Sequence, residues 1–233
     1  VVRRVSGMSL GEYFRREVAD PLGLDFWIGL PAEEHPRVSS LIPMTPPEGL
    51  STAGGDTDTG SGARAPTGLV EMLDILLGPG NLAGRALSAP GGAAADEQIW
   101  NDPRTLSAQI PAANGVTNAK SLARMYASMV GNVDGVQLFE PEILDVAIEP
   151  QVEGPDAVLM FPIPFALGFM AHSNFSPFLG GRSFGHYGAG GSVGLADPDR
   201  RISVGYVMNQ MHFGLAGDPR TAGLLSAVDA CVG

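Results

Sequence analysis

Hydrophobic residues recur with helical spacing close to the start of the chain. The pattern S-x-x-E formed by Ser9 and Glu12 is a capping box, the reciprocal pair of bonds that begins a helix. Apolar side chains follow at intervals of three and four residues, namely Leu10, Tyr13, Phe14 and Val18. The sequence therefore predicts a helix from residue 9 that ends at Pro21 and Gly23.

The clearest helical pattern lies in the middle of the chain. It is expected to begin at Thr117 or Asn118, either of which is a suitable N-cap, and to end before Gly131. One face of this helix is apolar and consists of Leu122, Met125, Tyr126 and Met129. Shorter helices are predicted over residues 70–77, from Pro141 to about residue 147, and from Asp218 to about residue 230.

From residue 165 onwards the apolar residues alternate with other residues, which is typical of half-buried strands. The alternation predicts strands over residues 165–171, 183–187, 191–196 and 202–208. A turn at Asp197–Asp199, with proline at its second position, is expected to join the last two strands as a hairpin. Residues 25–28 form either a short buried strand or a connector.

Two segments, residues 43–68 and 78–97, are rich in glycine, proline and small residues and are predicted to be loops. Such long excursions are either walls or lids of a site or simply mobile. Helices and loops followed by an antiparallel meander and a closing helix predict an α+β fold, with an antiparallel sheet flanked by helices. We expect one domain over 1–233, with a helical and loop region (1–160) followed by antiparallel strands and the closing helix (161–233).

Composition narrows the possible functions. The formal net charge is -11 and no basic stripe is present, so nucleic acid is an unfavourable partner. Cys231 is the only cysteine and the four histidines are scattered, which argues against an internal disulfide and a metal site. The longest uncharged run, residues 157–181, is interrupted by prolines and polar residues, so no membrane span is predicted.

The densest small-residue motif is F-G-H-Y-G-A-G-G-S-V-G, residues 184–194, in which five of eleven residues are glycine. Glycine inside a strand costs entropy and packs nothing, but it lets a ligand or a backbone approach closely. One interpretation is a strand edge whose N–H groups meet a substrate. The other is a sharply twisted or bulged hairpin.

Three stretches of the chain resemble the serine β-lactamase and penicillin-binding family, in its class C and family VIII carboxylesterase branch. RRVSGMSLGEYFRREVADPLGLDFWIGLP is similar to the helix and connector that follow the family's tyrosine motif. NGVTNAKSLARMYASM is similar to a later helix beside the active site, and SFGHYGAGGSVGLADPDRRISVGYVMNQM to the strand pair with the third motif. The resemblance implies a β-lactamase/transpeptidase-like fold that is incomplete at its N-terminus.

In this family the third motif is K-T-G, or H-x-G in many esterases, and here it is His186-Tyr187-Gly188. The resemblance implies that the Ala189 N–H donates to the oxyanion and that His186 faces the acyl group. The predicted catalytic residues are therefore His186, Gly188 and Ala189. The predicted substrate-binding residues are Tyr187, Gly190 and Trp100, the last as part of the wall of an acyl pocket.

Two of the family's motifs are absent from this chain. The nucleophile of the family lies in S-x-x-K, but the single lysine here is Lys120, in T-x-x-K with Thr117. That segment matches a different helix of the family, so a helix cap and a surface lysine are the better interpretation. None of the four tyrosines has asparagine two residues on, so Y-x-N is missing, and Ser192 is followed by a strand rather than by the helix that a nucleophile elbow requires.

The chain is therefore expected to be the C-terminal part of a serine hydrolase that acts on esters or β-lactam-like amides through an acyl-enzyme. Without nucleophile and base the isolated chain is expected to be inactive, and it should associate with a separate N-terminal fragment or with itself. A histidine in place of the K-T-G lysine is largely uncharged near pH 7 and favours uncharged esters. The alternative is a non-catalytic binding protein on the same scaffold. No cofactor is implied, and the sequence does not specify a compartment.

Overall fold

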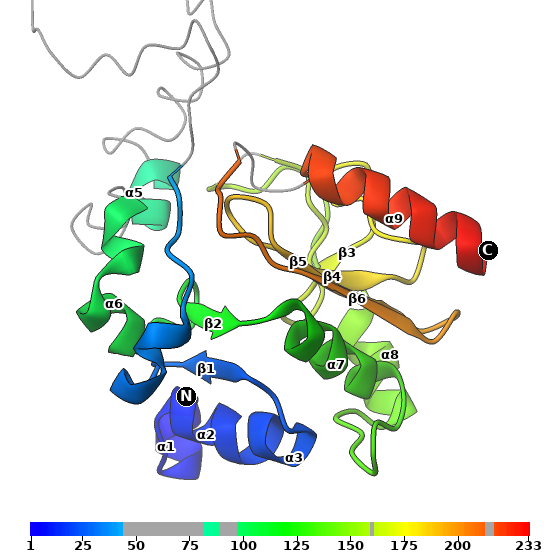
Figure 1. Ribbon diagram of the computed structural model, residues 1–233. Helices are drawn as coiled ribbons and strands as arrows, with labels where there is room; N and C mark the ends of the chain where they lie inside the picture. The colour runs from blue at the N-terminus through cyan, green and yellow to red at the C-terminus, as the bar shows by residue number, and fades with distance from the viewer. Residues whose placement is uncertain (44–81, 89–96, 159–160, 213–216) are drawn as a thin grey trace, which may run out of the picture.

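The computed structural model describes residues 1–43, 82–88, 97–158, 161–212 and 217–233 (Figure 1). The predicted helix over residues 70–77 lies outside these ranges, as does nearly all of the predicted loop over residues 43–68. Part of the second predicted loop, residues 78–97, is helical instead, since α5 spans Leu82–Ser88.

Helices precede and follow a short antiparallel meander. The helices are α1 (Val2–Ser6), α2 (Leu10–Phe14), the π-helix η1 (Arg15–Ala19), α3 (Asp20–Leu22), the 3-10 helix η2 (Ala32–Arg37), α5, the 3-10 helix η4 (Glu97–Asn101), α6 (Pro103–Ser107), α7 (Ala119–Val130), α8 (Pro141–Ile148) and α9 (Pro219–Val232). The strands are β1 (Phe26–Ile28), β2 (Gly115–Thr117), β3 (Met170–Ala171), β4 (Phe184–Tyr187), β5 (Val193–Asp197) and β6 (Ile202–Tyr206).

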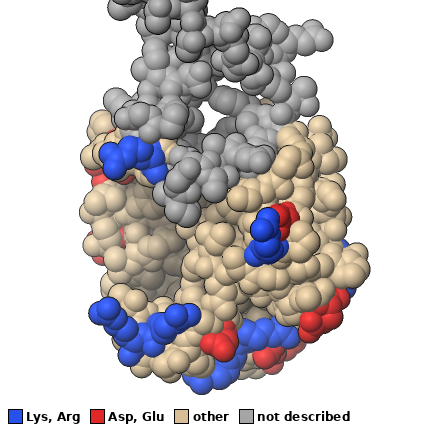
Figure 2. Space-filling model, turned by 90° about the vertical axis from the view of Figure 1, so that its left-hand side faces the viewer, with Lys and Arg blue, Asp and Glu red and all other residues tan. Residues whose placement is uncertain are grey.

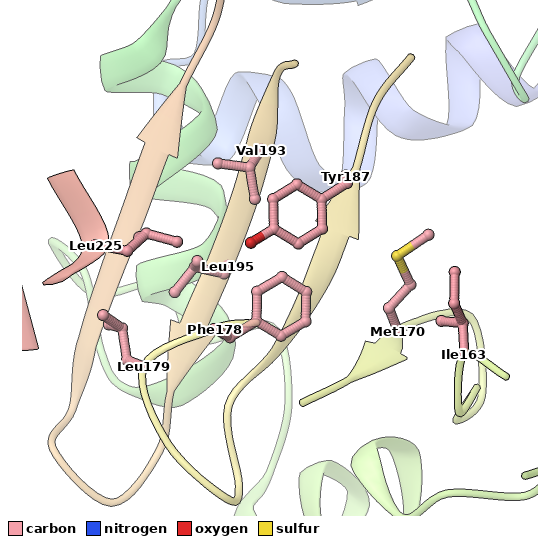
Figure 3. Close-up of a cluster of buried hydrophobic side chains, with 8 residues drawn as sticks. All are labelled: Ile163, Met170, Phe178, Leu179, Tyr187, Val193, Leu195 and Leu225. Carbon is pink, nitrogen blue, oxygen red and sulfur yellow. The ribbon is translucent and has the colours of Figure 1, made fainter. Parts of the chain in front are cut away.

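The main sheet has the strand order β3-β4-β5-β6 with every neighbouring pair antiparallel, and helices cover both of its faces (Figure 1). Side chains alternate along β5 because successive residues of a strand point to opposite faces. Val193 and Leu195 pack with Leu225 of α9 on one face (Figure 3). Ala196 packs with Tyr126 of α7 on the other. The α+β architecture predicted from the sequence is therefore confirmed.

The first predicted helix is present and begins with the predicted capping box. The Ser9 hydroxyl accepts a hydrogen bond from the Glu12 N–H at 3.3 Å, and the Glu12 carboxylate accepts one from the Ser9 N–H at 2.8 Å. The helix widens into the π-helix η1 and continues through Pro21, so Pro21 does not end it. Gly23, with a φ of 61°, is the residue that ends it, because glycine adopts this left-handed conformation without strain.

Residues 25–28 form a strand, but its partner strand is not apparent in the sequence. β1 pairs with β2 so that Phe26 lies opposite Thr117, 91 positions later in the chain. Thr117 is therefore a strand residue whose hydroxyl donates to the Asp25 carbonyl at 2.9 Å. The N-cap of α7 is Asn118, whose side chain accepts a hydrogen bond from the Ser121 N–H at 2.8 Å.

The predicted strand over residues 165–171 is mostly wrong, since only Met170–Ala171 joins the ladder. Gly168 has a φ of 90°, which turns the chain away from the extended conformation. The Leu167 N–H donates to the Ala147 carbonyl at the end of α8 instead of to a strand, and its side chain is 56% exposed. The other three strands lie where the alternation predicts them.

Helix α7 lies against the sheet where two glycines face each other. Gly194 of β5 is paired with Gly205 of β6. A Cβ atom at Gly205 would lie 2.5 Å from the Ala119 carbonyl oxygen and 2.6 Å from the Ala123 nitrogen, both in the backbone of α7. A Cβ atom at Gly194 would lie 2.4 Å from the Tyr126 ring. Helix α7 therefore packs directly on the strand backbone, with no side chain between them. Only glycine at positions 194 and 205 permits this contact.

The hairpin between β5 and β6 is fixed by a buried carboxylate. Asp197 is 1% exposed and accepts hydrogen bonds from the Arg200 guanidinium at 2.7 Å and the Ser183 hydroxyl at 3.1 Å. It also accepts hydrogen bonds from the backbone N–H groups of Asp199 and Arg200. The Arg200 guanidinium continues to Asp229 at 3.1 Å and so ties the hairpin to α9.

Candidate active site at the end of strand β4

The glycine-rich segment after β4 folds into a tight turn that leads into β5. The Gly188 N–H donates to the Ser192 carbonyl at 2.7 Å, and the Gly191 N–H donates back to the Gly188 carbonyl at 3.1 Å. Residues 188–191 thus form a β-turn with Ala189 second and Gly190 third. Gly190 has a φ of 88°, the value that a type II turn requires at its third position.

In the described ranges no strand pairs with the part of β4 next to this turn, and we call this part the open edge. β3 pairs only with Phe184 and Gly185, so β4 continues past the end of its neighbour. Backbone groups alternate between the two sides of an antiparallel strand. Gly188 points to β5, so the N–H of Ala189 points to the open side. Ala189 is exposed, and no residue in the described ranges accepts a hydrogen bond from its N–H.

His186 also lies exposed at this edge of the sheet. Its Nδ1 lies 2.6 Å from the Tyr187 carbonyl oxygen, and its ring lies 6.2 Å from the Phe165 ring. A carbonyl oxygen can only accept, so Nδ1 is the protonated nitrogen in this contact. In the neutral imidazole Nε2 is then an acceptor. The neutral His186 side chain thus has one acceptor nitrogen, and it is exposed three residues before Ala189 in the chain.

The structure separates the Tyr187 side chain from the open edge. Its ring is 3% exposed and stacks on Phe178 at 5.1 Å between centroids, within the core beneath α9 (Figure 3). The Tyr187 hydroxyl donates to the Pro177 carbonyl, and burial raises the pKa of Tyr187 to about 12. Only the backbone of Tyr187 faces the edge, so any contact with substrate there involves its peptide groups.

Gly190 and Gly191 contact His212, Asp218 and Arg220, which no motif in the sequence identifies as site residues. The Gly190 carbonyl accepts hydrogen bonds from the His212 N–H at 2.9 Å and from the Arg220 guanidinium at 2.7 Å. A Cβ atom at Gly191 would lie 2.1 Å from the Asp218 carboxylate. In the sequence the segment Asp218-Pro219-Arg220 carries only the signal of a helix start, so its contact with the turn is not predictable from local pattern.

Arg220 is fixed in place by Asp218, the N-cap of α9. The guanidinium lies 2.6 Å from one Asp218 oxygen and 3.0 Å from the other, and it also donates to the Gln210 carbonyl at 2.8 Å. Asp218 is 7% exposed. The hydrogen bonds from Arg220 hold the pKa of Asp218 below its usual value, so both side chains are charged near neutral pH.

Trp100 belongs to the same region but not to the turn itself. It lies half-buried in η4, next to Asn101, whose side chain bonds both the N–H and the carbonyl of Leu41. The neighbouring Ile42 forms a parallel bridge with Gln210, just before the segment that supports Gly190. Within the described part of the chain no hydrogen bond or ring contact joins Trp100 directly to residues 186–190.

The two alternative serine and threonine candidates have structural roles. Thr117 lies in β2 and Lys120 in α7, and the Thr117 hydroxyl is engaged by the Asp25 carbonyl. The Ser192 hydroxyl accepts a hydrogen bond from the Met208 N–H at 3.3 Å, between two strands. Ser192 leads into β5, so it lacks the helix that follows a nucleophile elbow. Thr117 ends β2 just before α7, but its hydroxyl is bound to the backbone there.

Three observations concern the surface, metal-binding groups and membrane-spanning helices. Figure 2 shows a largely uncharged face with a hollow on its left; most charged side chains lie along its lower rim, and others lie on the right half of the face and at its upper left. In the described ranges, no group of three or more His, Cys, Asp or Glu side chains is arranged to hold a metal ion. In the same ranges, no helix is both long and apolar enough to cross a membrane.

The sequence matches a known protein family and a known esterase/β-lactamase. Residues 1–228 match the family described as Beta-lactamase. The chain is 30% identical over 218 residues to "Esterase/beta-lactamase LipL" of Mycobacterium tuberculosis (strain ATCC 25618 / H37Rv), covering 91% of this chain and 45% of that protein.

Solved structures show the same likeness. EstA from Arthrobacter nitroguajacolicus Rue61a matches with a TM-score of 0.78 and 27% identity over 99% of this chain and 56% of its own. A family VIII carboxylesterase matches with a TM-score of 0.75 and 28% identity over 98% of this chain and 54% of its own. The chain therefore spans about half the length of the proteins it resembles.

Proposed function

The chain belongs to the beta-lactamase family, as the match over residues 1–228 shows, and from this premise we propose that it is the C-terminal part of a serine hydrolase that cleaves esters through an acyl-enzyme. Residues 1–233 then form a single incomplete domain that carries the oxyanion-binding strand. The esterase and carboxylesterase names of its relatives favour this chemistry.

The observation that carries the proposal is the free N–H of Ala189 at the open edge of β4. An exposed backbone donor at a fixed turn is the group that an acyl-transfer site needs, because charge develops on the carbonyl oxygen of the substrate in the transition state. His186 is exposed on the same edge, and in this proposal it faces the acyl group. Gly190 lets the turn form at a positive φ and pack closely on Met208 and Met211, so it helps to fix the position of Ala189.

The nucleophile and its base would lie outside these 233 residues. The chain has one lysine and lacks both S-x-x-K and Y-x-N, and it covers about half of each relative. Among the described strands none pairs with the outer edge of β6, which leaves its backbone groups available to a further strand. A separate N-terminal segment on this edge, or self-association through it, would complete the sheet.

The residue at position 186 and the net charge indicate the class of substrate. A histidine at position 186, in place of the lysine of the K-T-G motif, lacks the permanent ammonium charge that would bind a substrate carboxylate. The net charge of -11 also disfavours anionic substrates. We therefore propose an uncharged ester as the substrate, with β-lactam-like amides as the second candidate.

The test compares this 233-residue chain with the polypeptide as its gene encodes it. Each is treated with a fluorophosphonate, examined by intact-mass spectrometry and assayed with a p-nitrophenyl ester. We expect labelling and turnover only in the encoded polypeptide, at a serine outside residues 1–233. A labelled serine within the 233 residues, or an encoded polypeptide that is neither labelled nor active, would refute the proposal, and the latter result favours the non-catalytic binding protein.

A second experiment uses a substitution to test the oxyanion donor itself. Ala189→Pro removes the N–H, and proline is the residue that best fits the second position of this turn, so the fold should persist. Loss of one such donor lowers kcat by about 10²- to 10³-fold. Ala189→Ser keeps the N–H and is the matched control, with kcat close to that of the unchanged protein. If Ala189→Pro is folded and retains full kcat, Ala189 does not bind the oxyanion.

A further inference from the structure

A chain of hydrogen bonds runs from the Arg220 guanidinium to the free N–H of Ala189. Arg220 donates to the Gly190 carbonyl at 2.7 Å. That carbonyl shares its peptide bond with the Gly191 N–H, which donates to the Gly188 carbonyl at 3.1 Å. The Gly188 carbonyl in turn shares its peptide bond with the Ala189 N–H.

Each hydrogen bond in this series strengthens the next one. A donor on a carbonyl oxygen draws electrons out of the peptide unit and makes its N–H a stronger donor, and such chains are cooperative. The first donor here is a charged guanidinium, and charge-assisted hydrogen bonds are about twice as strong as neutral ones. The last N–H, that of Ala189, has no acceptor among the described residues and points to the open edge.

We propose that Arg220 is a positioning residue for acyl transfer, which polarises the Ala189 N–H through the peptide units of Gly190–Gly191 and Gly188–Ala189. This inference rests on the proposed function, because it assigns the polarised N–H to the oxyanion. Arg220 itself does not touch the substrate in this scheme. Arg220 acts through the turn, and its hydrogen bonds to Asp218 keep the Arg220 guanidinium directed at the Gly190 carbonyl.

The packing around the turn explains why the hydrogen bonds from Arg220 to the turn need glycine at positions 190 and 191. A Cβ atom at Gly190 would lie 2.7 Å from the Met208 methyl group and 2.9 Å from Met211 Cγ. At Gly191 it would meet the Asp218 carboxylate at 2.1 Å and the Arg220 guanidinium at 2.5 Å. A side chain at either position would push the turn away from Arg220 and break the first link.

Arg220→Met removes the charge and the donors while keeping an unbranched side chain. Arg200→Met is the matched control, because Arg200 also bridges an aspartate, a backbone carbonyl and α9, but at the opposite end of β5. In the encoded polypeptide, we expect Arg220→Met to lower kcat for a p-nitrophenyl ester by about tenfold, less than loss of a whole oxyanion donor. KM should change by less than about threefold, Arg220→Lys should recover part of kcat, and Arg200→Met should leave kcat unchanged although it lowers Tm.

The ¹H chemical shift of the Ala189 amide gives a readout that does not depend on turnover. It should move upfield in Arg220→Met and stay in place in Arg200→Met, with the signal assigned from the Ala189→Ser variant. Equal kcat in the two arginine variants, or an unmoved Ala189 amide in Arg220→Met, would overturn the inference. An encoded polypeptide without esterase activity would refute the proposed function alone, and the amide shift would still decide whether Arg220 polarises the Ala189 N–H.

Discussion

The contact between α7 and the paired glycines of β5 and β6 makes a sharp prediction about stability. Gly205→Ala would place a methyl group 2.5 Å from the Ala119 carbonyl oxygen and 2.6 Å from the Ala123 nitrogen. Both atoms belong to the backbone of α7, so no side-chain rotation can relieve the contact. The helix must move away from the sheet by about 1 Å to restore ordinary contact distances.

The size of the effect follows from this geometry. Overpacking a close contact costs about 1–3 kcal/mol, and a clash with the helix backbone belongs at the upper end of that range. Alanine also stiffens the unfolded chain, which offsets about 0.4–1 kcal/mol. We therefore expect the free energy of unfolding to fall by about 2 kcal/mol, which lowers Tm by about 4–8 °C in a chain of this size.

Two further glycine variants make the experiment specific. Gly194→Ala meets the Tyr126 ring, which can adjust, so its cost should be smaller than that of Gly205→Ala. Gly223→Ala lies in α9 with open space around it, and it should stabilise the protein by about 0.5–1 kcal/mol. Thermal and urea unfolding followed by circular dichroism measure all three. A Tm of Gly205→Ala equal to or above that of the unchanged protein would refute the packing of α7 on bare backbone.

Further predictions concern the buried polar groups. Burial acts to raise the pKa of Asp197, but the hydrogen bonds from Arg200 and Ser183 outweigh it and hold the pKa below its usual value of 3.8. This carboxylate therefore stabilises the fold above about pH 4 and loses that contribution as the pH falls through its folded-state pKa. Asp197→Asn should cost about 2 kcal/mol at pH 7, the range for hydrogen bonds to a charged group, with the difference in urea midpoint shrinking towards pH 2; a constant difference would contradict this. Asn114, 6% exposed, bonds the Thr105 and Ala108 carbonyls and the Ile110 N–H. Asn114→Ala should cost about 2 kcal/mol, and an unchanged urea midpoint would show that water replaces these bonds at no cost.

Local signals in the sequence located most of the elements. The capping box at Ser9 and Glu12, the cap at Asn118 and the alternation in residues 183–206 each depend on neighbours a few positions away, so they can be seen in the sequence. The pairing of β1 with β2 joins residues about 90 positions apart and leaves no local signal. The expected strand over residues 165–171 failed because one positive φ at Gly168 outweighs an alternating pattern.

The candidate site divides in the same way. The motif around His186 and Gly188 carries the resemblance to the family, so the turn could be located from the sequence alone. The support of that turn by Arg220 could not, because it brings together residues 30 positions apart through a side chain that sequence alone does not orient. The orientation of Tyr187, in contrast, follows from the local pattern. Alternation along β4 directs its side chain into the core and leaves the side chain of His186 exposed.

The dependence of α7 on the sheet also has a consequence during synthesis. The apolar face of α7, formed by Leu122, Tyr126 and Met129, is covered by β5, which begins at Val193. About 60 residues separate the end of the helix from that strand, so at about 5–20 residues per second the ribosome takes about 3–13 s to produce its cover. During that interval the nascent helix presents an unsatisfied apolar surface, and this is the stretch of the chain that a ribosome-associated chaperone is expected to hold.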